Sequence, residues 1–568
     1  SEPVRRWIPR ALLGDPGLPS SRPRLWIPVL AGLLSGCSRP APPAPPSDAV
    51  LLVTIDTLPA SRVGCYGAPN VRTPEIDRLA RAGLQVVDAI SPAPLTLPSH
   101  STMLTGLDPP DHGVRENGIF ELDDRHATVA EQLPGDVRKA AFVGSFPLAS
   151  RFNLDQGFDL YDDDFGPRED TRRPPERRAE TVFQSAAAWL DGAGARPFAW
   201  VHAFDPHYPY AAPLPWRRVA ETLAGAGPYE GEVAYVDREL GKLLRRVGAH
   251  DRARRATVLL TADHGESLGE HGEITHAIFI YDATQRVPLM LAGPGVEPRL
   301  ETRPRRLADV APTLLDRYGL GPSDANDGTP LLEAPPERPA YLETKHTELL
   351  RGWSPLHAVR TERWKYIRAP RPELYDLRDD PGERANLAGS QPEIESELER
   401  RLEEILAASV ASPAADLDAG TAARLRSLGY VASVEVGSAP DLRKDPKDGV
   451  VSAAALFHGE QAYVDGRFRA AEHHLLRAIE LDPERKDAHS FLAGTYCGLN
   501  RWDLAAEHAQ RSLDLPPHLN EGPVHSTLGE ALLALGEPAK ALPHLKIALE
   551  ERPESARLKK LVAEAQGR

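Results

Sequence analysis

This sequence has few cysteines, no long apolar run and no excess of basic residues, and each shortage excludes a class of protein. Its 568 residues include three cysteines, Cys37, Cys65 and Cys497, too few for a disulfide framework. Acidic residues outnumber basic ones by 82 to 67, which gives a formal net charge of −15. General binding of nucleic acid and passive adhesion to an anionic membrane surface both need a basic surface. We therefore expect no nucleic-acid partner, and the length predicts two or more globular domains.

The apolar segment at residues 25–34 has ten residues, too few to cross a bilayer, which takes roughly 20. Arg22 and Arg24 precede it, and Leu-Ser-Gly-Cys at residues 34–37 closes it. A basic start, an apolar middle and small residues at the end are the layout of a signal peptide, and the closing tetrapeptide resembles the bacterial lipobox. The alternative is a chance apolar stretch in a wrongly assigned N-terminal region.

The predicted signal peptide and upstream segment occupy residues 1–36. A proline-rich tether at residues 37–47 follows and would stay extended. The sequence thus predicts a protein of the bacterial cell envelope, either periplasmic or held at the membrane by a lipid anchor on Cys37.

From the tether to about residue 320, apolar β-rich segments alternate with helical patterns at 74–82 and 233–247, which predicts an α/β domain with a mostly parallel sheet flanked by helices. Short strands with a Trp- and Tyr-rich face predict a small antiparallel subdomain at 340–390. An amphipathic helix is expected at about 391–408, so the whole domain would span 48–410. The expected buried strands of the large sheet are residues 49–55, 140–144, 198–204, 257–261 and 288–292.

The last 120 or so residues repeat with a period of 34 to 36. Small residues let paired helices approach closely, and proline ends a helix because it cannot donate the next hydrogen bond. This pattern resembles tetratricopeptide repeats and predicts an all-α solenoid at 448–568, joined by a linker at 411–447. Such a solenoid would bind a protein or peptide partner on its concave surface, or would only stabilise the preceding domain. The aligned residues are Ala471, Ala505 and Ala541, and likewise Pro483, Pro517 and Pro553.

Residues of the kinds that bind metal ions follow three of the expected strands. Asp56 comes after the first, His207 lies just beyond another, and Asp263 and His264 follow a third. Ligands collect beyond the carboxyl ends of strands in open parallel sheets, so these side chains could converge. Singly, each is weak evidence, because an aspartate after a strand is commonly just the cap of a helix or turn.

A series of motifs runs in order along the first domain. It includes LVTIDTL at 52–58, TLPSHSTMLTG at 96–106, DPHYPY at 205–210 and TADHGESLGEHG at 261–272. Together they resemble the sulfatase family of the alkaline-phosphatase superfamily, over roughly residues 48–390. The resemblance implies an alkaline-phosphatase-like fold and a metal-dependent ester hydrolase or transferase.

The expected metal ligands are Asp56, Asp263 and His264, with the hydroxyl of Thr96 completing the shell. A bound divalent cation polarises an ester oxygen and lowers the pKa of a coordinated hydroxyl, which is otherwise too weak a nucleophile at neutral pH. Thr96 occupies the family's nucleophile position, where true sulfatases carry a Cys or Ser that becomes formylglycine. We therefore expect no formylglycine in this chain.

Developing charge on the transferred group needs hydrogen-bonding or cationic partners. The resemblance implies His207, His276 and Asn117 for this role, the alternative for each histidine being a satisfied structural residue. His271 could bind a second metal ion or cap a turn. An imidazole ligand such as His264, where sulfatases commonly have Asn and Ca²⁺, favours Zn²⁺ or Mn²⁺ over Mg²⁺ or Ca²⁺.

Three functions follow from these residues. The first is a hydrolase or transferase acting on phosphate-type esters through Thr96, with a lipid headgroup or a surface glycan as substrate. The second is a sulfuric ester hydrolase. The third is a catalytically degenerate protein that binds a ligand while the repeats recruit a partner, favoured by Pro59 and Ser61, which stand where relatives carry Arg and Asp.

Overall fold

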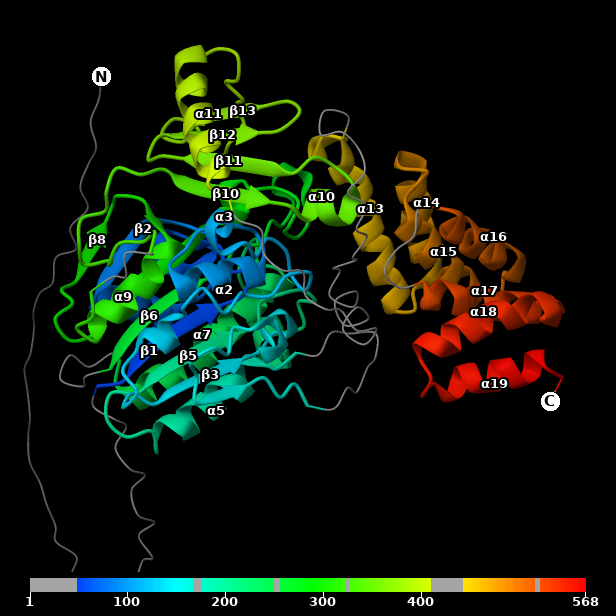
Figure 1. The fold of residues 1–568 in the computed structure, drawn as a ribbon, viewed down its shortest axis with the longest axis horizontal. Coiled ribbons are helices and arrows are strands. Elements are labelled where there is room, and N and C mark those ends of the chain that lie inside the picture. Colours follow the sequence, from blue (N-terminus) through cyan, green and yellow to red (C-terminus); the bar gives the residue numbers. More distant parts are fainter. Residues whose placement is uncertain are drawn as a thin grey trace, which may run out of the picture. The chain divides into compact units, whose positions relative to one another are not determined.

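A nine-stranded, mostly parallel sheet lies at the centre of the α/β region in this computed structural model (Figure 1). The predicted signal peptide and tether, and linker residues 411–442, lie outside the described residues. The structure describes residues 48–166, 176–249, 256–321, 326–409, 443–515 and 521–567.

The strand order of the large sheet is β4-β3-β5-β1-β6-β7-β2-β8, with β9 paired to β2. β1 is entirely buried and pairs in parallel with β5 on one side and β6 on the other, as expected for an apolar strand covered on both faces. β7 runs antiparallel to both of its neighbours, so the sheet is mixed at this point. The bounds are β1 Val50–Ile55, β2 Leu84–Ile90, β3 Lys139–Val143, β4 Leu160–Asp162, β5 Phe198–Ala203, β6 Thr257–Ala262, β7 Arg286–Ala292, β8 Arg299–Glu301 and β9 Arg305–Arg306.

Helices flank this sheet, as the sequence predicts. α1, α5, α6 and α7 pack on one another in one group, whereas α2, α4 and α9 form a second group. α2 is the most deeply placed, since all ten of its residues are buried. The bounds are α1 Pro74–Ala82, α2 Thr96–Thr105, α3 Pro109–His112, α4 Val129–Gln132, α5 Ala179–Leu190, α6 Leu214–Glu221, α7 Pro228–Val247, α8 Asp282–Gln285 and α9 Val310–Arg317.

A second, four-stranded antiparallel sheet confirms the small subdomain predicted at 340–390. Its strands follow one another in chain order, and Leu398 and Leu402 of α11 pack on Tyr341 and Val359 from it. The bounds are β10 Ala340–Thr344, α10 His346–Arg351, β11 Leu356–Arg360, β12 Trp364–Arg368, β13 Glu373–Asp376 and α11 Pro392–Ala407.

The remaining described residues form an all-helical segment, which we call the C-terminal helical region. Consecutive helices pack on one another, and the aligned alanines Ala471, Ala505 and Ala541 are fully buried between them. Its bounds are α13 Pro446–Val464, α14 Phe468–Leu481, α15 Lys486–Gly498, α16 Trp502–Asp514, α17 Gly522–Ala534, α18 Pro538–Glu551 and α19 Ala556–Ala565.

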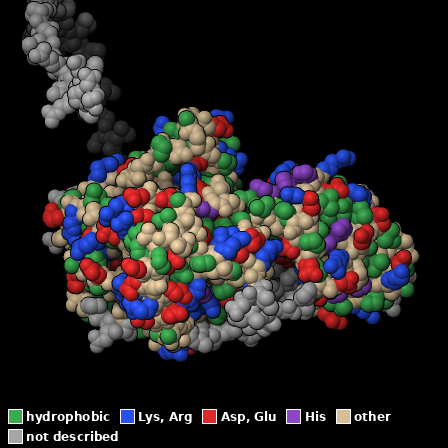
Figure 2. Space-filling model, turned by 90° about the horizontal axis from the view of Figure 1, so that it is seen from above, with side chains coloured by type: hydrophobic (Ala, Val, Ile, Leu, Met, Phe, Trp, Pro, Cys, Tyr) green, Lys and Arg blue, Asp and Glu red, His purple; other side chains and the backbone are tan. Residues whose placement is uncertain are grey.

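Two general features concern the described residues as a whole. No helix among them is long and apolar enough to cross a membrane. On the face seen in Figure 2, acidic and basic side chains are interspersed.

The C-terminal helical region packs on the α/β region through Trp353, which is only 3% exposed. Val450 and Ala453 of α13 share an apolar cluster with Trp353 and Ile278. The backbone of Ser354 donates to the carbonyl of Lys444 at 2.9 Å, although residues 443–447 are the end of the predicted linker. The C-terminal helices therefore share a core with the α/β region.

Gly449 lies so close to Trp353 that an added Cβ would meet the indole ring at 2.3 Å. We expect Gly449→Ala to lower the free energy of unfolding by about 1–3 kcal/mol, the usual effect of overpacking. Helix propensity alone would predict the opposite, a gain of up to about 1 kcal/mol. Urea unfolding followed by tryptophan fluorescence measures the change. Val451→Ala, at an exposed position of the same helix, is the control, and a stabilised Gly449→Ala variant would contradict the packing described here.

Candidate active site

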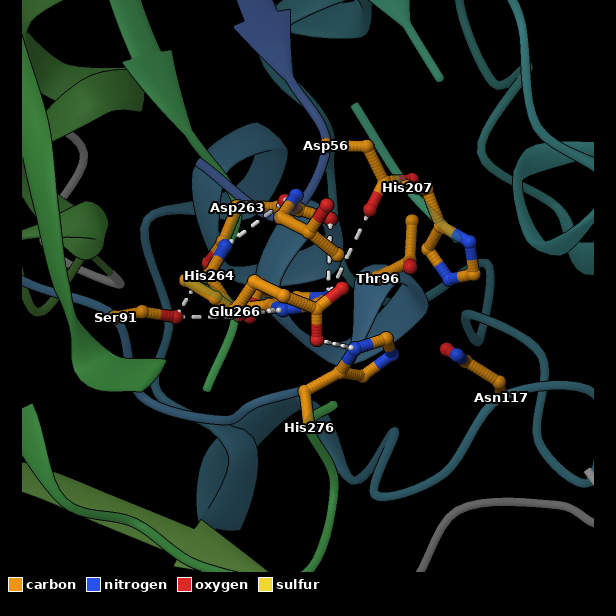
Figure 3. Close-up of polar contacts among 12 residues, drawn as sticks. Asp56, Ser91, Thr96, Asn117, His207, Asp263, His264, Glu266 and His276 are labelled. Atoms are coloured by element: carbon orange, nitrogen blue, oxygen red, sulfur yellow. Dashed lines mark hydrogen bonds and ion pairs between the residues drawn. The ribbon is translucent and has the colours of Figure 1, made fainter. Parts of the chain in front are cut away.

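Three side chains at the carboxyl ends of β1 and β6 form the centre of the candidate site. Ile55 pairs with Ala262 at the last position of these two parallel strands, so the residues that follow them lie side by side. Asp56, Asp263 and His264 are fully buried, and one ligand atom from each lies within 4.8 Å of the others (Figure 3).

Hydrogen bonds from the backbone fix how these groups point. Asp263 Oδ1 accepts from the backbone N–H groups of Thr57 at 3.2 Å and His264 at 2.8 Å. Thr57 reaches this position with a φ of 52°, a region that non-glycine residues seldom adopt. His264 Nδ1 lies 3.0 Å from the carbonyl of Gly265, so it carries the proton and leaves Nε2 free as a ligand.

The remaining atoms of this group have no hydrogen-bond partner within the described part of the chain. Both carboxylate oxygens of Asp56, Oδ2 of Asp263 and Nε2 of His264 are buried without a hydrogen bond. Burial, and then the charge of Asp263, raise the pKa of Asp56 well above its usual range. Burying two neighbouring carboxylates is unfavourable unless a cation compensates them. The donor set therefore fits a divalent metal ion.

Thr96 is the first residue of α2 and is 1% exposed. Its side chain lies beside Asp56 and His207 (Figure 3). Asn117 Oδ1 accepts from the backbone N–H of Leu97 at 2.7 Å, which fixes the first turn of the helix. The Nδ2 group of Asn117 is buried without a partner among the described residues, so it is available to a substrate oxygen. An N-terminal helix end adds a partial positive charge here.

His207 and His276 stand on the other side of this space, with ring centroids 5.1 Å apart. His207 Nδ1 lies 2.7 Å from the carbonyl of Tyr208, and His276 Nδ1 lies 2.9 Å from Glu266 Oε1. Burial, with a smaller contribution from His276, lowers the pKa of His207 to about 3. Burial lowers the pKa of His276 as well. Both rings are therefore neutral at pH 7. His207 Nδ1 carries the proton because the Tyr208 carbonyl can only accept, so Nε2 of this ring is a hydrogen-bond acceptor.

Some residues at the site were not singled out from the sequence. Glu266 orients His276, and burial raises its pKa to about 8; its place in the 261–272 motif was the available signal. His202 Nε2 lies 3.5 Å from Asp56 Oδ2, and nothing in its sequence context marks it. His100 and His202 form a second metal-type group with Asp263. Both ring nitrogens of His100 are already hydrogen-bonded, so it fits a structural role better.

His271 lies apart from the two metal-type groups found among the described residues. It has a φ of 54° and its ring stacks on Tyr281 at 3.7 Å. The arrangement favours the turn-forming alternative over a second metal site.

The fold and this donor set fit a metal-dependent ester hydrolase. Residues 48–320 match the family model described as "Sulfatase". Arylsulfatase K of Bos taurus is 24% identical over 479 residues, covering 67% of this chain and 87% of that protein. Choline-sulfatase of Rhizobium meliloti is 24% identical over 424 residues, 60% of this chain and 82% of that protein. The phosphonate monoester hydrolase structure of Agrobacterium radiobacter shares the fold, with a TM-score of 0.53 at 22% identity over 63% of this chain and 95% of that chain.

Asp263→Asn should remove the bound metal, because a neutral amide replaces one of two carboxylate ligands. We expect the affinity for the divalent ion to fall by more than roughly 10–100-fold, which is the loss seen when a residue that hydrogen-bonds to a metal ligand is removed. Metal content after dialysis, measured by mass spectrometry, tests this. Asp136→Asn, at an exposed carboxylate, is the matched control. Equal metal content in the two variants would contradict the assigned ligand set.

Proposed function

We propose that this sulfatase-family domain cleaves or transfers phosphate-type esters, with Thr96 as the nucleophile. The observation that carries this proposal is the position of Thr96 at the start of α2, beside Asp56, whose carboxylate belongs to the group of buried donors that lack partners. A threonine hydroxyl is a weak nucleophile unless it is activated, and a divalent ion held by these buried donors would activate it.

Asp56, Asp263 and His264 would hold the divalent ion, whose chemistry when bound is to polarise the ester oxygen and to activate a hydroxyl. The imidazole among the ligands favours Zn²⁺ or Mn²⁺ over Mg²⁺ or Ca²⁺. Because the nucleophile is threonine, formylglycine has no place in this scheme.

Thr96 Oγ1 gives its proton to a water molecule and forms a bond to the phosphorus atom, while the bond to the leaving oxygen breaks and that oxygen takes up a proton from water. Asn117 Nδ2 donates a hydrogen bond to an oxygen of the transferred group. His207 and His276 lie beside this space, and a neutral ring with its proton on Nδ1 presents Nε2 as an acceptor for a protonated oxygen of that group. Water then releases the group from Thr96 in a hydrolase, and a second alcohol accepts it in a transferase.

Sulfuric ester hydrolysis is the second candidate, because the curated relatives include an arylsulfatase and a choline-sulfatase. A third, a degenerate binding protein, rests on Pro59 and Ser61, but the intact set of partnerless buried donors argues against it. Substrate tests must therefore compare phosphate and sulfate esters directly.

Thr96→Ala should reduce kcat by at least ~10³-fold while metal content and folding stay unchanged. The assay compares phenyl phosphate, its diester and phenyl sulfate, each with Zn²⁺, Mn²⁺, Mg²⁺ and Ca²⁺. Thr105→Ala is the matched control, since that hydroxyl on the same helix bonds to the carbonyl of Ser101. Full activity of Thr96→Ala would assign the attack to Ser99 or to water.

We further propose that the enzyme acts at the bacterial cell envelope, on a lipid headgroup or a surface glycan. The motif at 34–37 supports a lipid anchor on Cys37, which would concentrate the enzyme near such substrates. The 34-residue period and the buried alanines of the C-terminal helices support tetratricopeptide repeats that bind a protein or peptide.

Cys37→Ser should release the protein from the membrane fraction, because the lipid anchor is attached through the sulfur of the cysteine, which serine lacks. Expression in a Gram-negative host, followed by fractionation and immunoblotting, measures the distribution. Cys65→Ser is the control for loss of a thiol elsewhere. Unchanged membrane association of Cys37→Ser would refute the anchor.

A further inference from the structure

A cavity of about 120 Å³ begins at the candidate catalytic histidines and extends to the C-terminal helical region. His207 and His276 line one end of it, and Phe457, Glu460 and Arg485 line the other. The ring of Phe457 on α13 contacts that of Tyr208, next to His207, with centroids 5.0 Å apart. The C-terminal helices therefore form a wall of the space that a bound ester would enter.

Two arginines from different parts of the chain meet in this cavity. Arg351 ends α10, and Arg485 directly precedes α15. Their guanidinium groups lie 5.5 Å and 5.6 Å from the ring of Trp353, so one indole holds both in place. Arg485 is only 8% exposed.

The Nε atoms of both arginines are buried and have no hydrogen-bond partner among the described residues. A buried donor without an acceptor is unfavourable by about 1–3 kcal/mol, and more where the group is charged. Two guanidinium groups that line the same cavity are also suited to binding an oxyanion.

Two acidic residues, Glu460 and Asp487, line the same cavity. Burial, and then the charge of Asp487, raise the pKa of Glu460 to about 7, so it carries little charge below neutral pH. Burial and the neighbouring Arg485 lower the pKa of Arg351 to about 9. The arginine pair is thus only partly compensated by the protein, and an anion would relieve the repulsion between them.

We propose that Arg351 and Arg485 bind a second oxyanion, a carboxylate, sulfate or phosphate, on the leaving group of the ester that Thr96 attacks. The proposal rests on the function proposed above and adds the substrate class: an ester whose leaving alcohol is itself anionic. The C-terminal helical region then contributes to substrate selection through Arg485. This role is separate from the binding of a protein or peptide partner.

The test compares phenyl phosphate with 3-carboxyphenyl phosphate, and the matching pair of sulfates, because the two phenols have nearly the same acidity. We expect the wild-type enzyme to show a kcat/KM roughly tenfold or more higher for the carboxylated ester, the value of a hydrogen bond to a charged group. Arg485→Gln should remove most of this preference, mainly through KM. Arg501→Gln, at an exposed arginine paired with Glu472, should keep it.

A preference that is absent in the wild type, or equal in wild type and Arg485→Gln, would overturn this inference and leave the proposed function standing. Turnover of no ester with any of the four metals would overturn the proposed function itself. If Arg485→Gln does not fold, an inhibition measurement on the wild-type enzyme tests the inference instead. Free 3-hydroxybenzoate should inhibit phenyl phosphate turnover at a lower concentration than phenol does, and equal inhibition by the two would again overturn the inference.

Discussion

The desolvated carboxylate pair at the ends of β1 and β6 is the constraint on which the rest of the site depends. Two parallel strands in register place Asp56 and Asp263 together, away from water, and the backbone donors around them satisfy only one of their four oxygens. Such a pair is unfavourable unless a cation neutralises it, so we expect binding of the proposed metal ion to be coupled to folding. The roles proposed for His264, Thr96 and Asn117 all depend on that carboxylate pair.

The second constraint is the position of Trp353. One indole ring packs against Gly449, shares an apolar cluster with α13, and carries Arg351 and Arg485 on its surface. The same contact joins the C-terminal helices to the α/β region and shapes the cavity beside the histidines. The proposed recognition of an anionic leaving group would therefore be linked to packing through a single side chain.

Much of this arrangement could be predicted because the responsible patterns are local or repetitive. Buried strands such as β1 appear as apolar runs, and the ligands follow strand ends in order, so Asp56, Asp263 and His264 could be expected to meet. His202 could not, because an inward-facing histidine inside an apolar strand looks like any other core position. The contact between Trp353 and α13 also escaped prediction, since it joins residues almost 100 positions apart without any periodic signal.

The apolar cluster beneath α13 also decides where this protein can be divided. Ile278, Phe279 and Trp353 are buried partly by Val450 and Ala453, which lie beyond linker residues 411–442. A chain cut at the linker would present these side chains to water as a contiguous apolar patch, a surface that promotes self-association. The linker therefore marks a boundary in composition but not a boundary between independently soluble units, and a catalytic fragment prepared for biochemistry has to retain at least the first C-terminal helix.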